Sequence, residues 1–248
     1  MDISNENLII HFTSSFENLT SIIKTASFRI TYSKEDFKIG KLRISSAAHP
    51  MVCFSEQKII ELSNRVITYG KYGIGFTKEW ARKKKLSPVI YISEYSMAAK
   101  GLAKLLRARQ NQEKSNLPDS LRLPIMQLKC FTKNEKGYNS HLKINSFDFK
   151  QENEWRYIPE KKDIGNGLIS QNKSRFLKNP DYYNNKLLKY PFRFNIKDIK
   201  VIFVENSNEI DKLVNRYKIE RNKIRIFNWK TEYKKANAQS SRPPRQIN

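Results

Sequence analysis

The chain has 248 residues, of which 39% are hydrophobic and 12% aromatic, so it is long enough to bury a core as one large domain or two small ones. Lys and Arg number 47 against 24 Asp and Glu, a net charge of +23 that favours an anionic partner such as nucleic acid, a nucleotide or an acidic protein. No apolar run approaches the ~20 residues that span a bilayer, and the first residues show no signal-peptide pattern, so we expect a cytoplasmic protein that does not enter a membrane.

The first half of the chain reads as short strands alternating with helices. Apolar patterns predict strands at residues 8–12, 28–32, 51–54 and 89–92, and helices that begin at Ser14, Ser55 and Thr77. The charged run 34–36 is typical of a connection between them. Gly70, Gly73 and Gly75 lie among aromatic residues and predict a strand that is bulged, or whose backbone something approaches closely.

The second half begins with the longest helical pattern, from Tyr95 to about Gln112. Residues 121–131 fit a helix or a strand equally well, and the Gly-, Asn- and Lys-rich stretch 160–178 predicts a mobile loop. A helix start at Asn179–Asp181 and a helix at 208–217 accompany strands at 192–194, 200–204 and 224–227. We therefore predict one α+β domain over residues 1–233, with surrounding helices on a mixed or antiparallel sheet, and a disordered basic tail over 234–248.

Cysteine and histidine are too sparse and too scattered to predict a metal site. Cys53 and Cys130 have apolar neighbours and no partner at metal-ligand spacing, and only three histidines are present. We expect buried free thiols and no bound metal. The sequence also lacks the Gly-rich phosphate loops of the common nucleotide-binding motifs.

The stretch 151–159 is the strongest candidate for chemistry. Read as a strand, it places Glu152, Glu154 and Arg156 on one face, whereas Trp155 and Tyr157 point the other way, into a core. Two carboxylates and a guanidinium in a row suit a catalytic site, but they suit equally a half-buried strand with a salt-bridged, solvated face.

A second candidate is His11, at the end of the first strand and just ahead of a helix. Backbone N–H groups at a helix start favour anionic ligands, so this position suits a ligand contact. The alternative is a histidine that is hydrogen-bonded for structural reasons only.

Several motifs, taken together and in order, resemble the AbiGi family of bacterial abortive phage-infection proteins. The similar segments are His11–Thr13, Met51–Ser55, Tyr69–Trp80, Pro88–Tyr91, Glu152–Arg156 and Asp198–Ile202. The resemblance implies a role in phage defence as the antitoxin member of a two-gene system. Its implied partner is a larger toxin, AbiGii, which looks like a nucleotidyltransferase.

A more distant resemblance, to DarT-like ADP-ribosyltransferases, rests on His11-x-Thr13 after the first strand and on the later strand glutamate, Glu154. It implies that fold, NAD as the cofactor, and transfer of ADP-ribose to nucleic acid or to a protein bound to nucleic acid. The implied catalytic residues are Glu154, Arg156 and Glu152, and the implied NAD contacts are His11, Thr13, Tyr69 and Tyr72. A carboxylate beside the breaking glycosidic bond would stabilise an oxocarbenium-like state.

Two functions therefore remain open at the level of sequence. One is an ADP-ribosyltransferase-like enzyme of phage defence, and the other is an antitoxin without catalysis that uses its positive surface to bind an acidic partner. A general nucleic-acid-binding module is a third reading, although the sequence contains no recognisable binding motif of that kind. If Glu154 lies on a solvated strand face, Glu154→Gln should leave stability almost unchanged.

Overall fold

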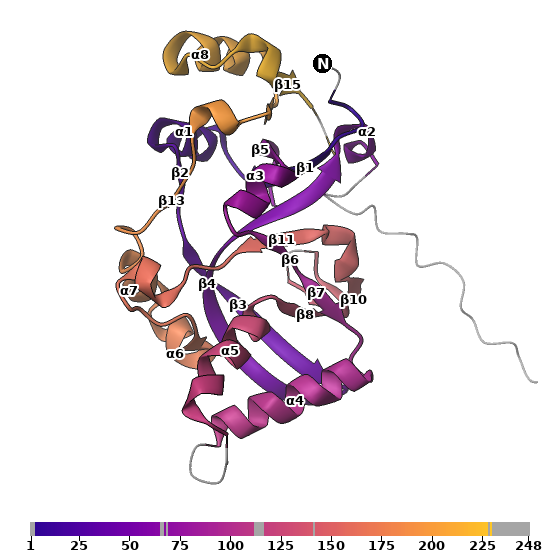
Figure 1. Cartoon of the computed structure of the whole chain (residues 1–248). Helices are drawn as coiled ribbons and strands as arrows, with labels where there is room; N and C mark the ends of the chain where they lie inside the picture. The colour runs from indigo at the N-terminus through magenta and orange to yellow at the C-terminus, as the bar shows by residue number, and fades with distance from the viewer. Residues whose placement is uncertain are drawn as a thin grey trace, which may run out of the picture.

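The structure is a computed structural model that describes residues 3–64, 67, 69–111, 117–140, 142–227 and 229. A large sheet runs through these residues in the order β15-β14-β5-β1-β4-β11-β6, with β3 and β12 also paired to β4 (Figure 1). Its strands are β1 (Asn7–Thr13), β3 (Thr31–Ile39), β4 (Leu42–Lys58), β5 (Tyr72–Thr77), β6 (Ser87–Pro88), β11 (Glu154–Tyr157), β12 (Gln171–Asn172), β14 (Val201–Val204) and β15 (Ile224–Ile226). Parallel pairing of β14 with β15 and antiparallel pairing elsewhere make the sheet mixed, so the predicted α+β class is confirmed.

Shorter ladders lie beside this sheet. The pairs are β2 (Ser27–Phe28) with β13 (Phe192–Arg193), β7 (Ile90–Ile92) with β8 (Thr132–Asn134), and β9 (Lys136–Asn139) with β10 (Ile144–Asp148). The strand β7 runs parallel to β8, so Lys133 of β8 arrives beside the sheet through a pairing that joins distant parts of the sequence.

The long strand β4 connects the two ends of the molecule. Its first half pairs with β3, and its second half lies between β1 and β11. Two predictions are wrong here. The charged run 34–36 is part of β3 and not a connection, and Ser55 continues β4 instead of capping a helix, because its hydroxyl donates to the Glu152 carbonyl. The following helix, α2 (Ile59–Leu62), is a single turn.

Helices cover the sheet at both ends (Figure 1). They are α1 (Phe16–Thr25), α3 (Lys78–Lys83), α4 (Met97–Gln110), α5 (Asp119–Cys130), α6 (Lys173–Lys178), α7 (Pro180–Asn185) and α8 (Ser207–Tyr217). Most begin where a side-chain oxygen accepts a hydrogen bond from a backbone N–H of the first turn; the caps are Ser15, Thr77, Ser96, Asn172, Asn179 and Asn206.

Helix α5 resolves the ambiguous stretch 121–131 as helical. The predicted mobile loop 160–178 is wrong as a description of the segment, because it contains the short helix η2 (Lys161–Ile164), β12 and α6, and β12 pairs with β4. In Figure 1, α1 and α8 lie at one end of the molecule and α4 and α5 at the other.

Alternation along β1 separates two apolar clusters, one on each face of the sheet. Ile9 belongs to the larger cluster, whereas Leu8, Ile10 and Phe12 belong to the smaller. The larger cluster is rich in aromatic contacts, including the stacked rings of Phe76 and Trp80 with centroids 3.9 Å apart.

The predicted close approach to the Gly-rich strand is confirmed, and the approaching groups belong to the protein itself. A Cβ added to Gly75 would lie 2.7 Å from Val201 Cγ1, and one added to Gly73 would lie 3.2 Å from a ring carbon of Phe203. Gly70 has φ +134°, and a Cβ there would lie 2.0 Å from the Thr13 carbonyl oxygen. The glycines let β5 pack tightly between β1 and β14.

None of the helices in the described part of the chain has the length and hydropathy to cross a bilayer. The predicted domain boundary at residue 233 and the tail 234–248 lie outside the described residues.

Candidate functional site

The candidate site is built around β11, which starts directly after Asn153. Asn153 has φ 42°, a left-handed conformation that ends the short helix η1 (Phe149–Glu152) and turns the chain into the strand. Within β11, Glu154 and Arg156 share one face and Trp155 lies on the other, as predicted. Glu152 belongs to η1 and not to the strand, so strand alternation does not place it.

Arg156 is fully buried and every nitrogen of its guanidinium is engaged. Its Nε donates to Glu154 Oε1 at 2.7 Å, one terminal nitrogen donates to the Cys130 carbonyl at 2.7 Å, and the other donates to Glu35 Oε1 at 2.7 Å. That last nitrogen also reaches Glu154 Oε2 at 3.0 Å. The predicted solvated face is therefore wrong, because this side of β11 is covered by β3 and by the end of α5.

A second cation, Lys133 of β8, extends the cluster. Its Nζ lies 2.7 Å from Glu152 Oε2 and 3.2 Å from Glu154 Oε2, and Tyr69 donates to Glu152 Oε1 at 2.8 Å. We refer to Glu35, Lys133, Glu152, Glu154 and Arg156 as the buried ion cluster. Its members come from three separate stretches of sequence, and three carboxylates face two cations.

The charges within the cluster shift the pKa values of Glu154 and Lys133 in opposite directions. Burial acts to raise the pKa of Glu154, but the charges of Arg156 and Lys133 and the Arg156 hydrogen bonds outweigh burial and hold that pKa well below its ordinary value. For Lys133, burial is opposed by Glu154 and Glu152, which raise its pKa well above the ordinary value. A carboxylate with so low a pKa is a weak general base and has no proton to donate as a general acid at neutral pH, although it can still stabilise a positive charge.

The predicted NAD contact His11 lies on the opposite face of the sheet from Glu154. Ile10 pairs with Ser55, and Ser55 pairs with Glu154, so these three side chains share a face and the next residue, His11, points away from it. His11 Nδ1 lies 2.8 Å from the Cys53 carbonyl, and its ring packs on Phe28. Burial lowers the pKa of His11 to about 4, so the ring is neutral at physiological pH.

The other predicted NAD contacts divide between the two faces. Thr13 is two residues from His11 on β1 and pairs with Tyr72, so all three lie on the face away from Glu154. The Tyr72 hydroxyl lies 2.8 Å from a Glu205 carboxylate oxygen and 2.9 Å from one of Glu209. The structure thus brings Tyr69, Glu152, Glu154 and Arg156 together, and separates them from His11, Thr13 and Tyr72.

Sequence reasoning missed Glu35 and Lys133. Glu35 sits in a charged run that reads as a loop, and its partner Arg156 is 121 residues away. Lys133 lies on a three-residue strand that has no periodic pattern of its own. No local signal in the sequence marks either residue as buried.

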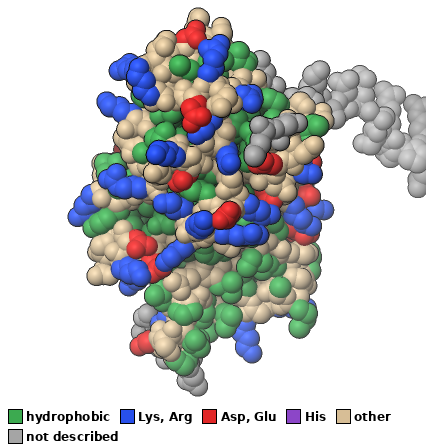
Figure 2. All heavy atoms as spheres, turned by 45° about the horizontal axis from the view of Figure 1, so that its top comes forward, with side chains coloured by type: hydrophobic (Ala, Val, Ile, Leu, Met, Phe, Trp, Pro, Cys, Tyr) green, Lys and Arg blue, Asp and Glu red, His purple; other side chains and the backbone are tan. Residues whose placement is uncertain are grey.

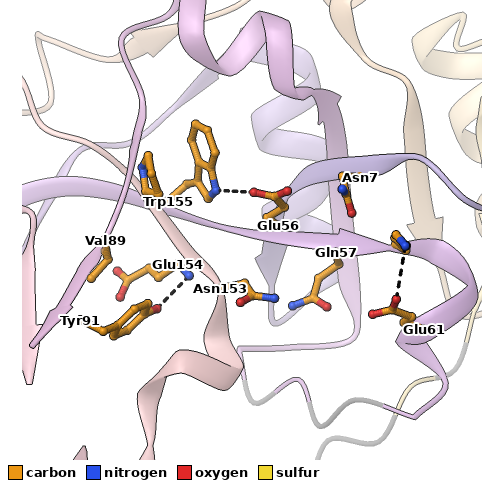
Figure 3. A pocket seen from close by; sticks show the side chains of 11 residues that line it. Asn7, Glu56, Gln57, Glu61, Val89, Tyr91, Asn153, Glu154 and Trp155 are labelled. Atoms are coloured by element: carbon orange, nitrogen blue, oxygen red, sulfur yellow. Dashed lines mark hydrogen bonds and ion pairs between the residues drawn. The ribbon is translucent and has the colours of Figure 1, made fainter. Parts of the chain in front are cut away.

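A cavity of about 270 Å³ lies beside the cluster (Figure 3). Glu154 of the cluster lines it, together with Trp155, Tyr91 and the polar side chains of Glu56, Gln57 and Asn153. Glu56 is already held by Lys78 at 2.7 Å and by Trp155 Nε1 at 2.9 Å, a contact drawn in Figure 3. The volume is below the ~300–1,000 Å³ of usual ligand pockets, and none of the predicted NAD contacts lines it.

The arrangement of the described side chains does not favour a bound metal ion. Within the described residues, no group of three or more His, Cys, Asp and Glu side chains is arranged to hold a metal ion. Cys53 and Cys130 are free thiols, and burial raises the pKa of Cys130 to about 12.

A comparison with protein families gives a match over most of the chain. Residues 21–205 match the family described as "Putative abortive phage resistance protein AbiGi, antitoxin". This span contains every member of the buried ion cluster but not His11 or Thr13 of β1. Neither the curated proteins nor the solved structures include a match to the chain.

Proposed function

Because three quarters of this chain match the family profile and it therefore belongs to the AbiGi family of abortive phage resistance proteins, we propose that it is an antitoxin that neutralises its toxin by binding. The description of the family as an antitoxin implies a toxin as the partner. We further propose that this toxin is of the AbiGii type. The main support for a binding function is that the predicted catalytic residues are engaged in ion pairs inside the protein itself.

In the buried ion cluster, Glu154 and Arg156 neutralise each other and their neighbours, and Arg156 has no exposed surface. A catalytic carboxylate has to reach the reacting atoms of a substrate, and Glu154 reaches two cations of its own chain instead. The cluster supports the fold at the junction of β3, β4, β8 and β11.

The excess positive charge lies on the protein surface, where a partner can contact it. Lys and Arg side chains are spread widely over the face shown in Figure 2, and they outnumber the Asp and Glu side chains among them. A net charge of +23 attracts an acidic partner and speeds its association. This distribution supports neutralisation of a toxin by a charged interface.

The test is to produce the full chain together with an AbiGii-type toxin in a bacterial host and to measure growth, complex formation and NAD consumption. We expect restored growth and a stable complex while the NAD concentration is unchanged. Toxicity that persists, with no complex between the purified proteins, would overturn the antitoxin proposal.

ADP-ribosyl transfer is the alternative that the same experiment addresses. That alternative assigns catalysis to Glu154, Arg156 and Glu152 and NAD binding to His11, Thr13, Tyr69 and Tyr72, in an ADP-ribosyltransferase-like fold that modifies nucleic acid or a protein bound to it. The position of His11, Thr13 and Tyr72 on the other face of the sheet argues against it. NAD consumption by the purified wild type, lost in a His11→Ala variant that remains folded, would favour this alternative over binding alone.

A further inference from the structure

Helix α4 presents an exposed side that no described residue covers. Met97, Gly101 and Leu105 follow one another at four-residue spacing, which puts them in one stripe along the helix. Met97 is 80% exposed and Leu105 is 40% exposed. The neighbouring helix α5 has three exposed leucines, Leu121, Leu123 and Leu128. Hydrophobic side chains gather in the lower part of Figure 2, below the Lys- and Arg-rich band.

Cations run along the edge of this stripe. Lys100, Lys104 and Arg107 are exposed, and their spacing places them in the sector of the helix beside Met97, on the side away from Leu105. None of the three has an ion-pair partner among the described residues, and α4 contains no carboxylate. The fourth cation of the helix, Arg109, is held by the Arg122 carbonyl at 3.1 Å.

The third observation concerns Gly101, which lies in the middle of α4. Glycine in the middle of a helix lowers helix stability relative to alanine, so its presence usually has a packing reason. Here a Cβ added to Gly101 would meet no atom within 4 Å, so the neighbouring parts of this molecule do not require glycine. The missing side chain leaves a notch between Met97 and Leu105, where the backbone of another chain can approach closely.

From these observations we propose that this side of α4, defined by Met97, Lys100, Gly101, Lys104, Leu105 and Arg107, is the surface that binds the toxin, through a segment that carries apolar residues beside Asp or Glu. The proposal rests on the antitoxin function proposed above. Charge complementarity selects this occupant, because an apolar stripe bordered by three cations that have no ion-pair partner in the described part of the chain matches an apolar segment bordered by carboxylates.

A second copy of this chain fits the surface poorly. A symmetric dimer formed through α4 would bring Lys100, Lys104 and Arg107 of both copies together across the interface. Like charges in such an arrangement oppose association. Nucleic acid would use the cations but would leave Met97 and Leu105 without apolar partners.

The first part of the test replaces the apolar residues one at a time in the full chain. Met97→Asp and Leu105→Asp should each weaken the affinity for purified AbiGii-type toxin by about tenfold or more, because a carboxylate would then face an apolar, acidic segment. The matched control is Leu177→Asp on α6, where the leucine is 50% exposed, and it should bind like the wild type. Met97 is the first residue of α4, where an acidic side chain favours the helix, so this variant keeps the test valid if Leu105→Asp folds poorly.

The second part of the test separates the effect of the charges on α4 from the effect of the net charge of the whole protein. Lys100→Glu combined with Lys104→Glu should slow association and reduce its dependence on salt. Lys24→Glu combined with Lys212→Glu changes the net charge by the same amount on α1 and α8, at the other end of the molecule, and should have a much smaller effect. Equal effects of the two pairs would mean that the whole surface, and not α4, attracts the toxin.

The third part uses Gly101→Gln, which supplies a better helix former and fills the notch. We expect a melting temperature equal to or above that of the wild type together with weaker toxin binding, a combination that a merely structural glycine would not give. Wild-type affinity in this variant and in both Asp variants would overturn the proposed surface and leave the antitoxin function intact. Absence of binding by the wild type would overturn both, and self-association lost in Leu105→Asp would assign the surface to a second copy.

Discussion

At the scale of single residues, Arg156 has no exposed surface and holds the buried carboxylates of Glu35 and Glu154. Arg156→Met removes the cation and leaves two buried negative charges, so unfolding should become easier by about 3–5 kcal/mol. The control is Arg221→Met, because Arg221 forms an exposed pair with Asp211 and its loss should cost less than about 1 kcal/mol. Urea titrations that give equal losses for the two variants would contradict this account of the buried ion cluster.

Glu154→Gln tests the same cluster from the side of the anion. On a solvated face the change would be neutral, but here it leaves Arg156 with Glu35 alone and Lys133 with Glu152 alone. We expect a loss of roughly 3 kcal/mol, the usual size for breaking a buried pair. The melting temperature of the variant therefore has to be measured beside any activity, since lost function would also follow from lost structure. An unchanged melting temperature would show that the cluster tolerates a missing charge.

His49 makes stability depend on pH. Its ring has no exposed surface, and burial, followed by the charge of Lys129, lowers its pKa from 6.5 to about 4. In the unfolded chain the ring takes up a proton near pH 6.5, so between pH 6.5 and about 4 the unfolded state binds more protons. Stability should therefore be complete above pH 6.5 and fall towards pH 4, by on the order of 3 kcal/mol.

His11, with its pKa also lowered to about 4, adds to the same decrease. Urea titrations between pH 7.5 and pH 4.5 measure the slope, and His49→Gln should reduce it without removing the part due to His11. A slope that is the same with and without His49 would show that this ring is not the titrating group.

At the scale of secondary-structure elements, two glycines should respond to alanine in opposite directions. Gly75→Ala places a methyl group 2.7 Å from Val201 Cγ1 in the packed β5–β14 pair and should destabilise by about 1–3 kcal/mol. Gly101→Ala adds a methyl group in open space on α4 and should stabilise by about 0.5–1 kcal/mol. Thermal unfolding of the two variants and the wild type measures both effects, and a loss of stability in Gly101→Ala would mean that the surroundings of α4 are more crowded than described.

The elements that could be predicted from sequence are those with a periodic apolar pattern or a clear cap. β1, β14, α4 and α8 follow such patterns, and Asn179 with Pro180 marks the start of α7. β3 could not be predicted, because its charged residues are typical of a loop. Only the pairing with β4, which the sequence pattern does not reveal, makes this segment a strand. The alternation that pairs Glu154 with Arg156 is local, whereas the partners that bury this pair come from distant segments.

For the whole molecule, the charge of +23 predicts that the protein binds polyanions in a salt-sensitive manner. Neutralised phosphates release counterions, so the logarithm of the binding constant should fall linearly as the logarithm of salt concentration rises. Titrations of the wild type with DNA and with RNA at several salt concentrations measure this slope. Binding that does not depend on salt, or that is missing at low salt, would exclude nucleic acid as a partner.

The separation of Glu35 from Arg156 by 121 residues has a consequence for the order in which the chain folds. During synthesis, β3 and β4 leave the ribosome long before β11 exists, so the Glu35 carboxylate waits without its cation until more than half of the chain has been made. Pairings over such long stretches of sequence slow folding. We therefore expect the pairing of β11 with β4, and with it the contact of Arg156 with Glu35, to form late in folding.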